Sequence, residues 1–363
     1  MNSEKRLENL RKKLKVESAD GIAVMLSSNV DYITGFDGIH DDENPHVALI
    51  TANEAIFYTD SRYRDVSQAQ VAGTPWSVRC SGAPVLDAVA DTLSELKLNA
   101  VAVEDAVPYK IYRECEEKFA PSAVVAAKGW VEKIRHEKDE NEIERIAAAQ
   151  AIADKAFAHI CTFIEPGVTE KEIAVELEYA MAKFGADAPG FLTIVASGAN
   201  GALPHCVPGS RKVQDGDFIT MDFGAQVGGY KSDMTRTVAI GHVTDLQRKV
   251  YETVFSANAA SNAAVRAGAT GVHIDKAGRD VIEEAGFGEH FGHGTGHGVG
   301  IDIHEGPNAS PRSKDVMQAG DILTIEPGIY LPGQLGVRIE DIVIVLETGE
   351  KVLSTSSKEL IIL

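Results

Sequence analysis

The second half of the chain contains the same order of predicted elements twice. Two helical patterns with a glycine between them are followed by strand-like runs, and the whole order then returns. The predicted helices lie at residues 140–164 and 169–184 in the first copy and at residues 244–266 and 273–285 in the second. Gly167 and Gly268 mark the breaks between helices, and they lie at nearly equal distances before Asp222 and Glu326. This spacing predicts an α+β domain with an internal pseudo-repeat.

A smaller α/β domain is expected before this duplicated region. The chain has 363 residues, which is long for one hydrophobic core and favours two domains. Short apolar runs alternate with helical patterns in the first part: predicted strands lie at 21–26, 47–50, 55–58 and 100–103, and predicted helices at 3–15 and 85–96. A dense run of charges at 132–146 is interpreted as a linker that passes into a helix. We therefore predict domains at residues 1–130 and 131–363.

The charge balance argues against two classes of partner. The chain has 35 Lys and Arg against 54 Asp and Glu, a formal net charge of -19. Such an acidic protein repels phosphate backbones and anionic lipid surfaces, so neither a nucleic acid nor a membrane is expected as a partner. The first residues are charged where a signal peptide needs an apolar stretch, and no run of about 18 apolar residues occurs. We therefore expect a cytoplasmic protein. Its four cysteines form no C-x-x-C pair, which favours reduced thiols.

Each copy contains a predicted β-hairpin that bears two acids. In FITMDFGAQVGGYKSDMTRT, apolar alternation brackets a turn at Gly228 and Gly229, with Asp222 and Asp233 on the two arms. A hairpin centred just before Gly228 would place the two aspartates directly opposite each other. A hairpin centred between the glycines would move the pairing by two residues. In either register the two carboxylates lie within reach across one face.

The second copy repeats this arrangement in ILTIEPGIYLPGQLGVRIEDIVIV. A hairpin centred on Gly333 sets Glu326 opposite Glu340. Like charges that face each other across a sheet are destabilising, by roughly 4 kcal/mol at about 4 Å and an effective dielectric constant of about 20. Either the acids point into water, or all four converge on cations. The occurrence of two such pairs in apolar strands favours cations.

A glycine-rich segment offers imidazole ligands for the same site. FGHGTGHGVGIDIHEG presents His293, His297 and His304 among glycines that permit close backbone approach. No Lys-Ser or Lys-Thr follows, which argues against a phosphate-binding loop, and the glycines argue against a helical zinc pair. Four carboxylates and an imidazole form a hard site that suits Mn, Co or Zn. Two metals that share bridging acids would support metal-assisted hydrolysis.

These motifs resemble the ordered signature of a known enzyme family. MDFG with SDMTR, HGTGHGVGID-IH, IEPG and VRIED are similar to motifs of metallopeptidases with the creatinase, or pita-bread, fold. That family includes Xaa-Pro aminopeptidase, prolidase and methionine aminopeptidase. The resemblance covers residues 132–363, and SSNVDYITGF and TDSRY resemble the smaller domain of the Xaa-Pro branch. It implies a C-terminal pita-bread domain after an α/β creatinase-like N-terminal domain.

The resemblance also implies roles for individual residues. Asp222 would bind one metal, Asp233 and Glu340 would bridge both, and His297 and Glu326 would complete the second. The implied metals are two divalent ions, with manganese expected and cobalt or zinc as alternatives. Further positions correspond to substrate-binding or catalytic groups of the Xaa-Pro enzymes: His205, His293, His304, Tyr330 and Arg338. His304 is a candidate proton shuttle; Arg338 could instead only neutralise the acids, and Tyr330 could simply pack in its strand.

The function implied is hydrolysis of the bond between an N-terminal residue and proline, by an Xaa-Pro aminopeptidase or dipeptidase. The partner would then be a proline-containing peptide, and the family resemblance implies a homo-oligomer, with a dimer expected. Two alternatives stay open. One is an enzyme similar to methionine aminopeptidase, and the other is a non-catalytic binding protein on the same scaffold.

Overall fold

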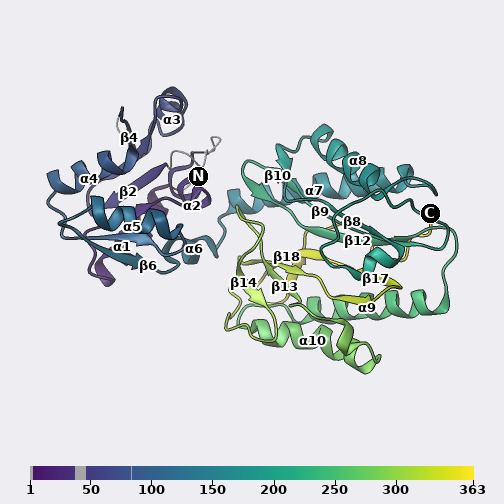
Figure 1. Cartoon of the computed structure of the whole chain (residues 1–363). Coiled ribbons are helices and arrows are strands. Elements are labelled where there is room, and N and C mark those ends of the chain that lie inside the picture. The colour runs from purple at the N-terminus through teal and green to yellow at the C-terminus, as the bar shows by residue number, and fades with distance from the viewer. Residues whose placement is uncertain (1–2, 37–45, 83) are drawn as a thin grey trace. The chain divides into compact units, whose positions relative to one another are not determined.

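The chain folds into two compact units, Met1–Arg135 and His136–Leu363. The computed structural model in Figure 1 describes residues 3–36, 46–82 and 84–363, and each unit is considered by itself. None of the helices in these ranges is both long enough and apolar enough to cross a membrane. The four cysteines are free thiols.

The first unit is built on a six-stranded mixed sheet with the order β4-β3-β2-β1-β5-β6. Its strands are β1 (Gly21–Val24), β2 (Val47–Thr51), β3 (Ala55–Thr59), β4 (Ser77–Cys80), β5 (Ala100–Glu104) and β6 (Ala123–Ala127). Its helices are α1 (Ser3–Val16), α2 (Ser27–Thr34), α3 (Arg64–Gln70), α4 (Val85–Glu95), α5 (Tyr109–Lys118) and α6 (Trp130–Arg135). The central strands β1, β2 and β3 are buried on both faces, which explains their continuous apolar runs. The predicted α/β character is confirmed.

A buried carboxylate connects β5 to the start of α2. Glu104, the last residue of β5, accepts hydrogen bonds from the backbone N–H groups of Met25 (2.6 Å) and Leu26 (2.9 Å) and from Asn29 Nδ2 (2.7 Å). The side chain is almost completely buried, and desolvation raises its pKa to about 7 despite these donors. These bonds hold Leu26 and Asn29 at the start of α2, although residues 27–29 are polar.

The second unit contains the expected duplication. Each copy begins with a helix pair: α7 (Glu140–Phe163) and α8 (Glu170–Lys183), then α9 (Asp245–Ala264) and α10 (Gly271–Glu284). All four helices start at a side chain that accepts a backbone N–H three residues further on, an N-cap that fixes where each begins: Asp139, Thr169, Thr244 and Thr270. The predicted helices of both copies are confirmed to within a few residues.

Strands follow each helix pair. The first copy has β7 (Ala188–Pro189), β8 (Ile194–Ser197), the 3-10 helix η1 (Gly198–Ala202), β9 (Phe218–Phe223), β10 (Ala225–Val227), β11 (Tyr230–Lys231) and β12 (Met234–Ala239). The second has η2 (Gly288–His290), β13 (Gly296–Gly298), β14 (Glu305–Ala309), β15 (Ile322–Ile325), β16 (Gly328–Leu331), β17 (Leu335–Arg338), β18 (Asp341–Val345) and β19 (Glu350–Val352). In Figure 1 the strands lie between α7 and α8 on one side and α9 and α10 on the other. Apolar side chains fill both interfaces.

The first acidic hairpin adopts one of the two registers that the sequence allowed. Asp222 pairs with Thr235 in the β9–β12 ladder, and Val227 pairs with Tyr230 across the turn. The hairpin is therefore centred between Gly228 and Gly229. Both glycines have positive φ, 54° and 82°, as a two-residue hairpin turn requires, and only glycine adopts this conformation without strain at both positions.

The second acidic hairpin has the predicted register. Ile325 pairs with Asp341 in β15–β18, and Gly328 pairs with Arg338 in β16–β17. The two ladders lie on either side of Glu326 and Glu340, and the residue pairs of both are symmetric about Gly333. The two glutamates therefore face each other at the point where the hairpin passes from one ladder to the next.

Replacing Glu104 with glutamine should change how the stability of the first unit depends on pH. The pKa of Glu104 is raised in the folded state, so ionisation favours the unfolded chain as the pH rises from about 4.5 to about 7. Over this range the wild type should lose up to about 3 kcal/mol of unfolding free energy relative to Glu104→Gln, with no further change above pH 7. Urea unfolding followed by tryptophan fluorescence measures this, because both tryptophans, Trp76 and Trp130, lie in the first unit.

The matched control is Glu117→Gln, which changes an exposed acid of helix α5. It should show no pH-dependent difference from the wild type. If the difference in unfolding free energy between the wild type and Glu104→Gln stayed constant from pH 5 to pH 8, the pKa of Glu104 would not be raised in the folded state.

Candidate metal centre

The predicted site residues gather in one cleft of the second unit. The cleft has a volume of about 390 Å³, and its lining includes His205, Asp222, Asp233, His293, His297, His304, Glu326, Arg338 and Glu340. Tyr330 is not part of the lining, but its hydroxyl lies 2.9 Å from His293 Nε2 and accepts a hydrogen bond from Arg338 Nη1 at 3.0 Å. Stretches more than a hundred residues apart in sequence thus form one site.

The four acids come from the two hairpins. Asp222 lies near the end of β9, and Asp233 directly precedes β12. Glu326 follows β15, and Glu340 lies between β17 and β18. Asp233 and Glu340 are almost fully buried, at 4% and 2% relative exposure. Asp222 and Glu326 are partly buried, with side chains 14% and 18% exposed. The acids therefore converge on the cleft and do not lie on the open surface.

Burial and mutual repulsion disfavour the ionised forms of three of these acids. Desolvation, followed by repulsion from Asp222, raises the pKa of Glu340 to about 8. Desolvation, followed by the charge of Glu340, raises the pKa values of Asp233 and Glu326 well above their ordinary range. A cation among the carboxylates would remove both penalties, because it supplies the charge and the ligand bonds that water would otherwise supply.

His297 is oriented as a metal ligand. Its Nδ1 lies 3.0 Å from the carbonyl oxygen of Gly298, which can only accept, so Nδ1 carries the proton. Burial lowers the pKa of the imidazole to about 4, and the ring is neutral at pH 7. The lone pair of Nε2 then faces the acids, 3.6 Å from Asp233 Oδ2 and 3.5 Å from Glu326 Oε1. A ligand histidine typically donates its other N–H to a carbonyl in this way.

The donor set fits a divalent metal. Ligand atoms of Asp233, His297 and Glu340 lie within 4.8 Å of one another. Asp222 Oδ1 is buried and, within the described residues, accepts no hydrogen bond. This oxygen is therefore available to bind a cation. Carboxylates with a neutral imidazole are ligands for hard or borderline divalent ions.

Arg338 connects the acids to Tyr330 and, through Tyr330, to His293. Its Nη2 donates to Asp222 Oδ2 at 2.5 Å, and its Nε donates to Thr235 Oγ1 at 2.9 Å. Through Nη1 it also holds the hydroxyl of Tyr330. Both nitrogens of His293 are engaged, Nδ1 with the carbonyl of Gly294 and Nε2 with Tyr330. Arg338 therefore neutralises Asp222, and Tyr330 does more than pack in its strand.

Two other histidines lie at the mouth of the cleft. His205 and His304 are exposed and belong to loop segments next to the acids. The ring of His304 lies against that of His297, with their centroids 4.4 Å apart. These side chains are accessible to a molecule that enters the cleft, whereas His293 and His297 are held within its wall.

Sequence reasoning missed several residues of the site. The hydroxyl of Thr235 donates to Glu340 Oε2 at 2.6 Å and accepts from Arg338. Its position two residues after Asp233, on the same strand face, was an available signal. Apolar side chains also line the cleft, and their sequence context carries no comparable signal: Phe191, Ile194, Pro204 and Ile303.

Comparison with known proteins places the chain in a family. The model of metallopeptidase family M24 matches residues 144–347, and that of the creatinase/prolidase N-terminal domain matches residues 6–136. The chain belongs to metallopeptidase family M24. The expected fold, an α/β creatinase-like domain followed by a pita-bread catalytic domain, is confirmed.

Similar proteins match this M24 chain along its whole length. An uncharacterized peptidase of Bacillus subtilis is 39% identical over 99% of this chain and 100% of its own. The structure of an Xaa-Pro dipeptidase from Bacillus anthracis has a TM-score of 0.95 at 40% identity, with 100% of both chains covered. That of an X-Pro aminopeptidase from Thermotoga maritima has a TM-score of 0.89 at 35% identity, covering 99% of this chain and 100% of its own.

Proposed function

We propose that this M24 peptidase is a dinuclear metal-dependent enzyme that hydrolyses the bond between an N-terminal residue and proline. The observation that carries the proposal is the convergence of two buried acids, two partly buried acids and a neutral imidazole on one cleft. Similarity to an Xaa-Pro dipeptidase and an X-Pro aminopeptidase supports the proline specificity. The apolar side chains of Phe191, Ile194 and Ile303 provide a surface suited to the proline ring.

In this proposal five side chains hold two divalent ions, with manganese expected and cobalt or zinc as alternatives. Asp222 would bind one ion, Asp233 and Glu340 would be shared by both, and His297 and Glu326 would complete the second. Divalent ions held there would supply Lewis acidity, which activates water and polarises the carbonyl of the peptide bond. Thr235 orients Glu340 by donating to one carboxylate oxygen, and His297 presents Nε2 because Gly298 fixes its tautomer.

The remaining residues act on the peptide. His304 and His205, exposed at the mouth, donate hydrogen bonds to the scissile carbonyl or move a proton to the proline nitrogen as it leaves. His293 and Arg338 line the wall where the substrate would lie, and Tyr330 holds His293 from behind through a hydrogen bond and accepts one from Arg338. Arg338 also orients Asp222 by donating to its carboxylate.

A panel of three peptides tests the substrate class. Protein loaded with Mn, Co or Zn should hydrolyse Gly-Pro, Ala-Pro-Ala or both, and should leave Met-Ala-Ser intact, as measured by chromatography of the products. Cleavage of Met-Ala-Ser alone would support the methionine aminopeptidase alternative. Inactivity toward all three peptides with every metal would support a non-catalytic binding protein.

Replacement of Glu340 by alanine should abolish turnover and lower the metal content. A bridging acid contributes to both ions, so its loss should reduce the bound metal per chain as well as the rate, by at least about 100-fold in kcat. Elemental analysis after gel filtration measures the stoichiometry. Glu347→Ala, which removes an exposed acid just beyond β18, is the matched control and should retain its metal. Unchanged stoichiometry in Glu340→Ala would show that the assigned role is wrong.

Replacement of His304 by alanine should lower the rate and leave the metals bound. General acid–base or hydrogen-bonding groups typically contribute about 100-fold to 10,000-fold in rate, so kcat should fall within that range. Steady-state kinetics and elemental analysis on the same sample give both quantities. His273→Ala changes an exposed histidine on α10 and should have wild-type kinetics. If His304→Ala also turned over at the wild-type rate, His304 would have no part in the mechanism.

A further inference from the structure

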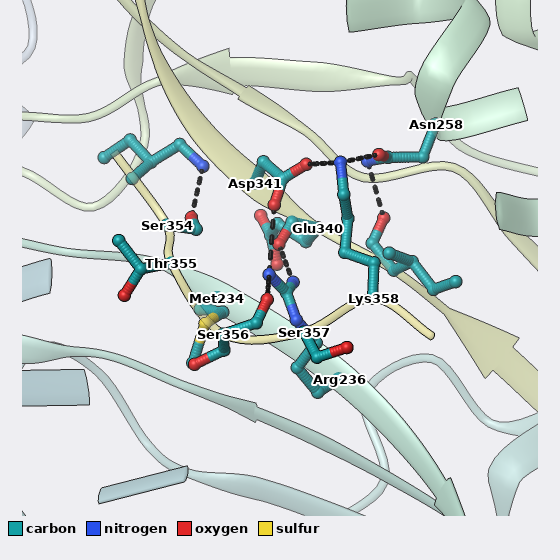
Figure 2. Close-up of polar contacts among 12 residues, drawn as sticks. Met234, Arg236, Asn258, Glu340, Asp341, Ser354, Thr355, Ser356, Ser357 and Lys358 are labelled. Atoms are coloured by element: carbon teal, nitrogen blue, oxygen red, sulfur yellow. Dashed lines mark hydrogen bonds and ion pairs between the residues drawn. The ribbon is translucent and has the colours of Figure 1, made fainter. Parts of the chain in front are cut away.

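Behind the acids, on the side away from the cleft, lies a cluster of polar side chains that the proposed chemistry does not use. We call Arg236, Asn258, Asp341 and Lys358 the support cluster (Figure 2). They come from β12, α9, β18 and the chain segment after β19. Arg236, Asn258 and Asp341 are at most 1% exposed. Buried polar groups of this kind require partners, so what they bond is informative.

Asn258 ties together the two strands that carry the glutamates. Its Nδ2 donates to the carbonyl oxygen of Ile325 at 2.9 Å and to that of Ile339 at 3.3 Å. These carbonyls directly precede Glu326 and Glu340. One amide group of helix α9 therefore sets the distance between the backbones from which the two acids project.

Arg236 holds the backbone at Glu340 from the other side. Its Nη1 donates to the carbonyl oxygens of Glu340 and Thr235, and its Nη2 donates to Asp341 Oδ1 at 3.1 Å. The same Nη2 also donates to the carbonyl of Ser356 at 2.9 Å. Figure 2 shows the guanidinium between Asp341 and this last segment of the chain.

Lys358 fixes the orientation of the amide. Its Nζ donates to Asp341 Oδ2 at 2.6 Å and to Asn258 Oδ1 at 2.9 Å. An ammonium group can only donate, so the amide oxygen of Asn258 must face Lys358 and the NH₂ group must face the two carbonyls. Asn262 Nδ2 also donates to this oxygen, at 3.0 Å, and it donates to the backbone carbonyl of Asn258 and to Asp341 Oδ2 as well, so it supports the same orientation.

The segment that bears Lys358 is anchored on both sides. Asp154 of α7 accepts the backbone N–H groups of Thr355 (3.0 Å) and Ser356 (2.8 Å). The hydroxyl of Tyr251 on α9 donates to the carbonyl of Lys358 at 2.9 Å. Residues 354–358 therefore connect helix α7 of the first copy to helix α9 of the second. This placement positions the ammonium group of Lys358 beside Asn258 and Asp341.

From these contacts we infer that Lys358 is a positioning residue for the metal centre: by orienting Asn258 and pairing with Asp341 it sets the spacing of Glu326 and Glu340. The inference rests on the proposed dinuclear site. An ion pair that only stabilised the fold would affect unfolding and leave the metal affinity of the folded protein unchanged. A positioning residue affects that affinity while the fold stays intact.

The test is Mn²⁺ binding to metal-free protein, measured by titration calorimetry at a temperature where circular dichroism shows each variant to be folded. Lys358→Met should bind Mn²⁺ at least about tenfold more weakly than the wild type, in the range found for residues that orient metal ligands. The matched control is Lys351→Met, which changes an exposed lysine on β19 and should bind as the wild type does. Equal affinity of Lys358→Met and the wild type would overturn the inference.

A second variant covers the case in which Lys358→Met does not fold. Asp154→Ala releases residues 354–358 from α7 and leaves the side chains of the support cluster unchanged. It should weaken Mn²⁺ binding by about threefold or more, which is less than the roughly tenfold loss expected for a residue that orients a metal ligand directly. Glu144→Ala removes an exposed acid from the same helix and serves as its control. Wild-type affinity in Asp154→Ala would overturn the inference, whereas a wild-type protein that binds no Mn²⁺, Co²⁺ or Zn²⁺ would instead overturn the proposed function.

Discussion

The arrangement of the site in the second unit depends on how the repulsion among four carboxylates is offset. Two acids on each hairpin face the same cleft, and burial makes the ionised forms of three of them costly, as the raised pKa values of Asp233, Glu326 and Glu340 indicate. A fold that depended only on apolar packing would exclude such a group of acids. The chain retains them and supplies donors to their carboxylates, Thr235 to Glu340 and Arg338 to Asp222. The arrangement is understandable if the acids bind cations.

The duplicated fold provides the rigidity that this arrangement needs. Helices α7 and α8 pack on the strands of the first copy, and α9 and α10 pack on those of the second. Each hairpin therefore has its own apolar support, and the acids meet where the two copies come together. Hydrogen bonds then join the copies, with Thr235 bonded to Glu340 and residues 354–358 linking α7 to α9. Preorganised ligands of this kind do not have to be assembled when the metal binds.

Much of this arrangement could be predicted from local patterns in the sequence. The helix pairs follow from apolar periodicity and from caps such as Thr169 and Thr244, and the second acidic hairpin follows from symmetry about Gly333. The register of the first hairpin could not be chosen, because a glycine pair permits two turn positions. The final register depends on both glycines adopting positive φ. Helix α2 was missed because its first residues are polar, and only the fold shows that Glu104 bonds the side chain of Asn29.

The support cluster was beyond the reach of sequence patterns for a different reason. Asn258 lies among alanines in the middle of a helix, and Lys358 lies in a serine-rich segment, so neither belongs to a recognisable motif. Their importance arises from contacts between residues a hundred positions apart. The most direct test of the central claim is an anomalous difference map from a crystal of this protein grown with Mn²⁺. The account predicts two peaks between the acids, each in contact with both Asp233 and Glu340, and it would be contradicted by a map with no peak among these side chains.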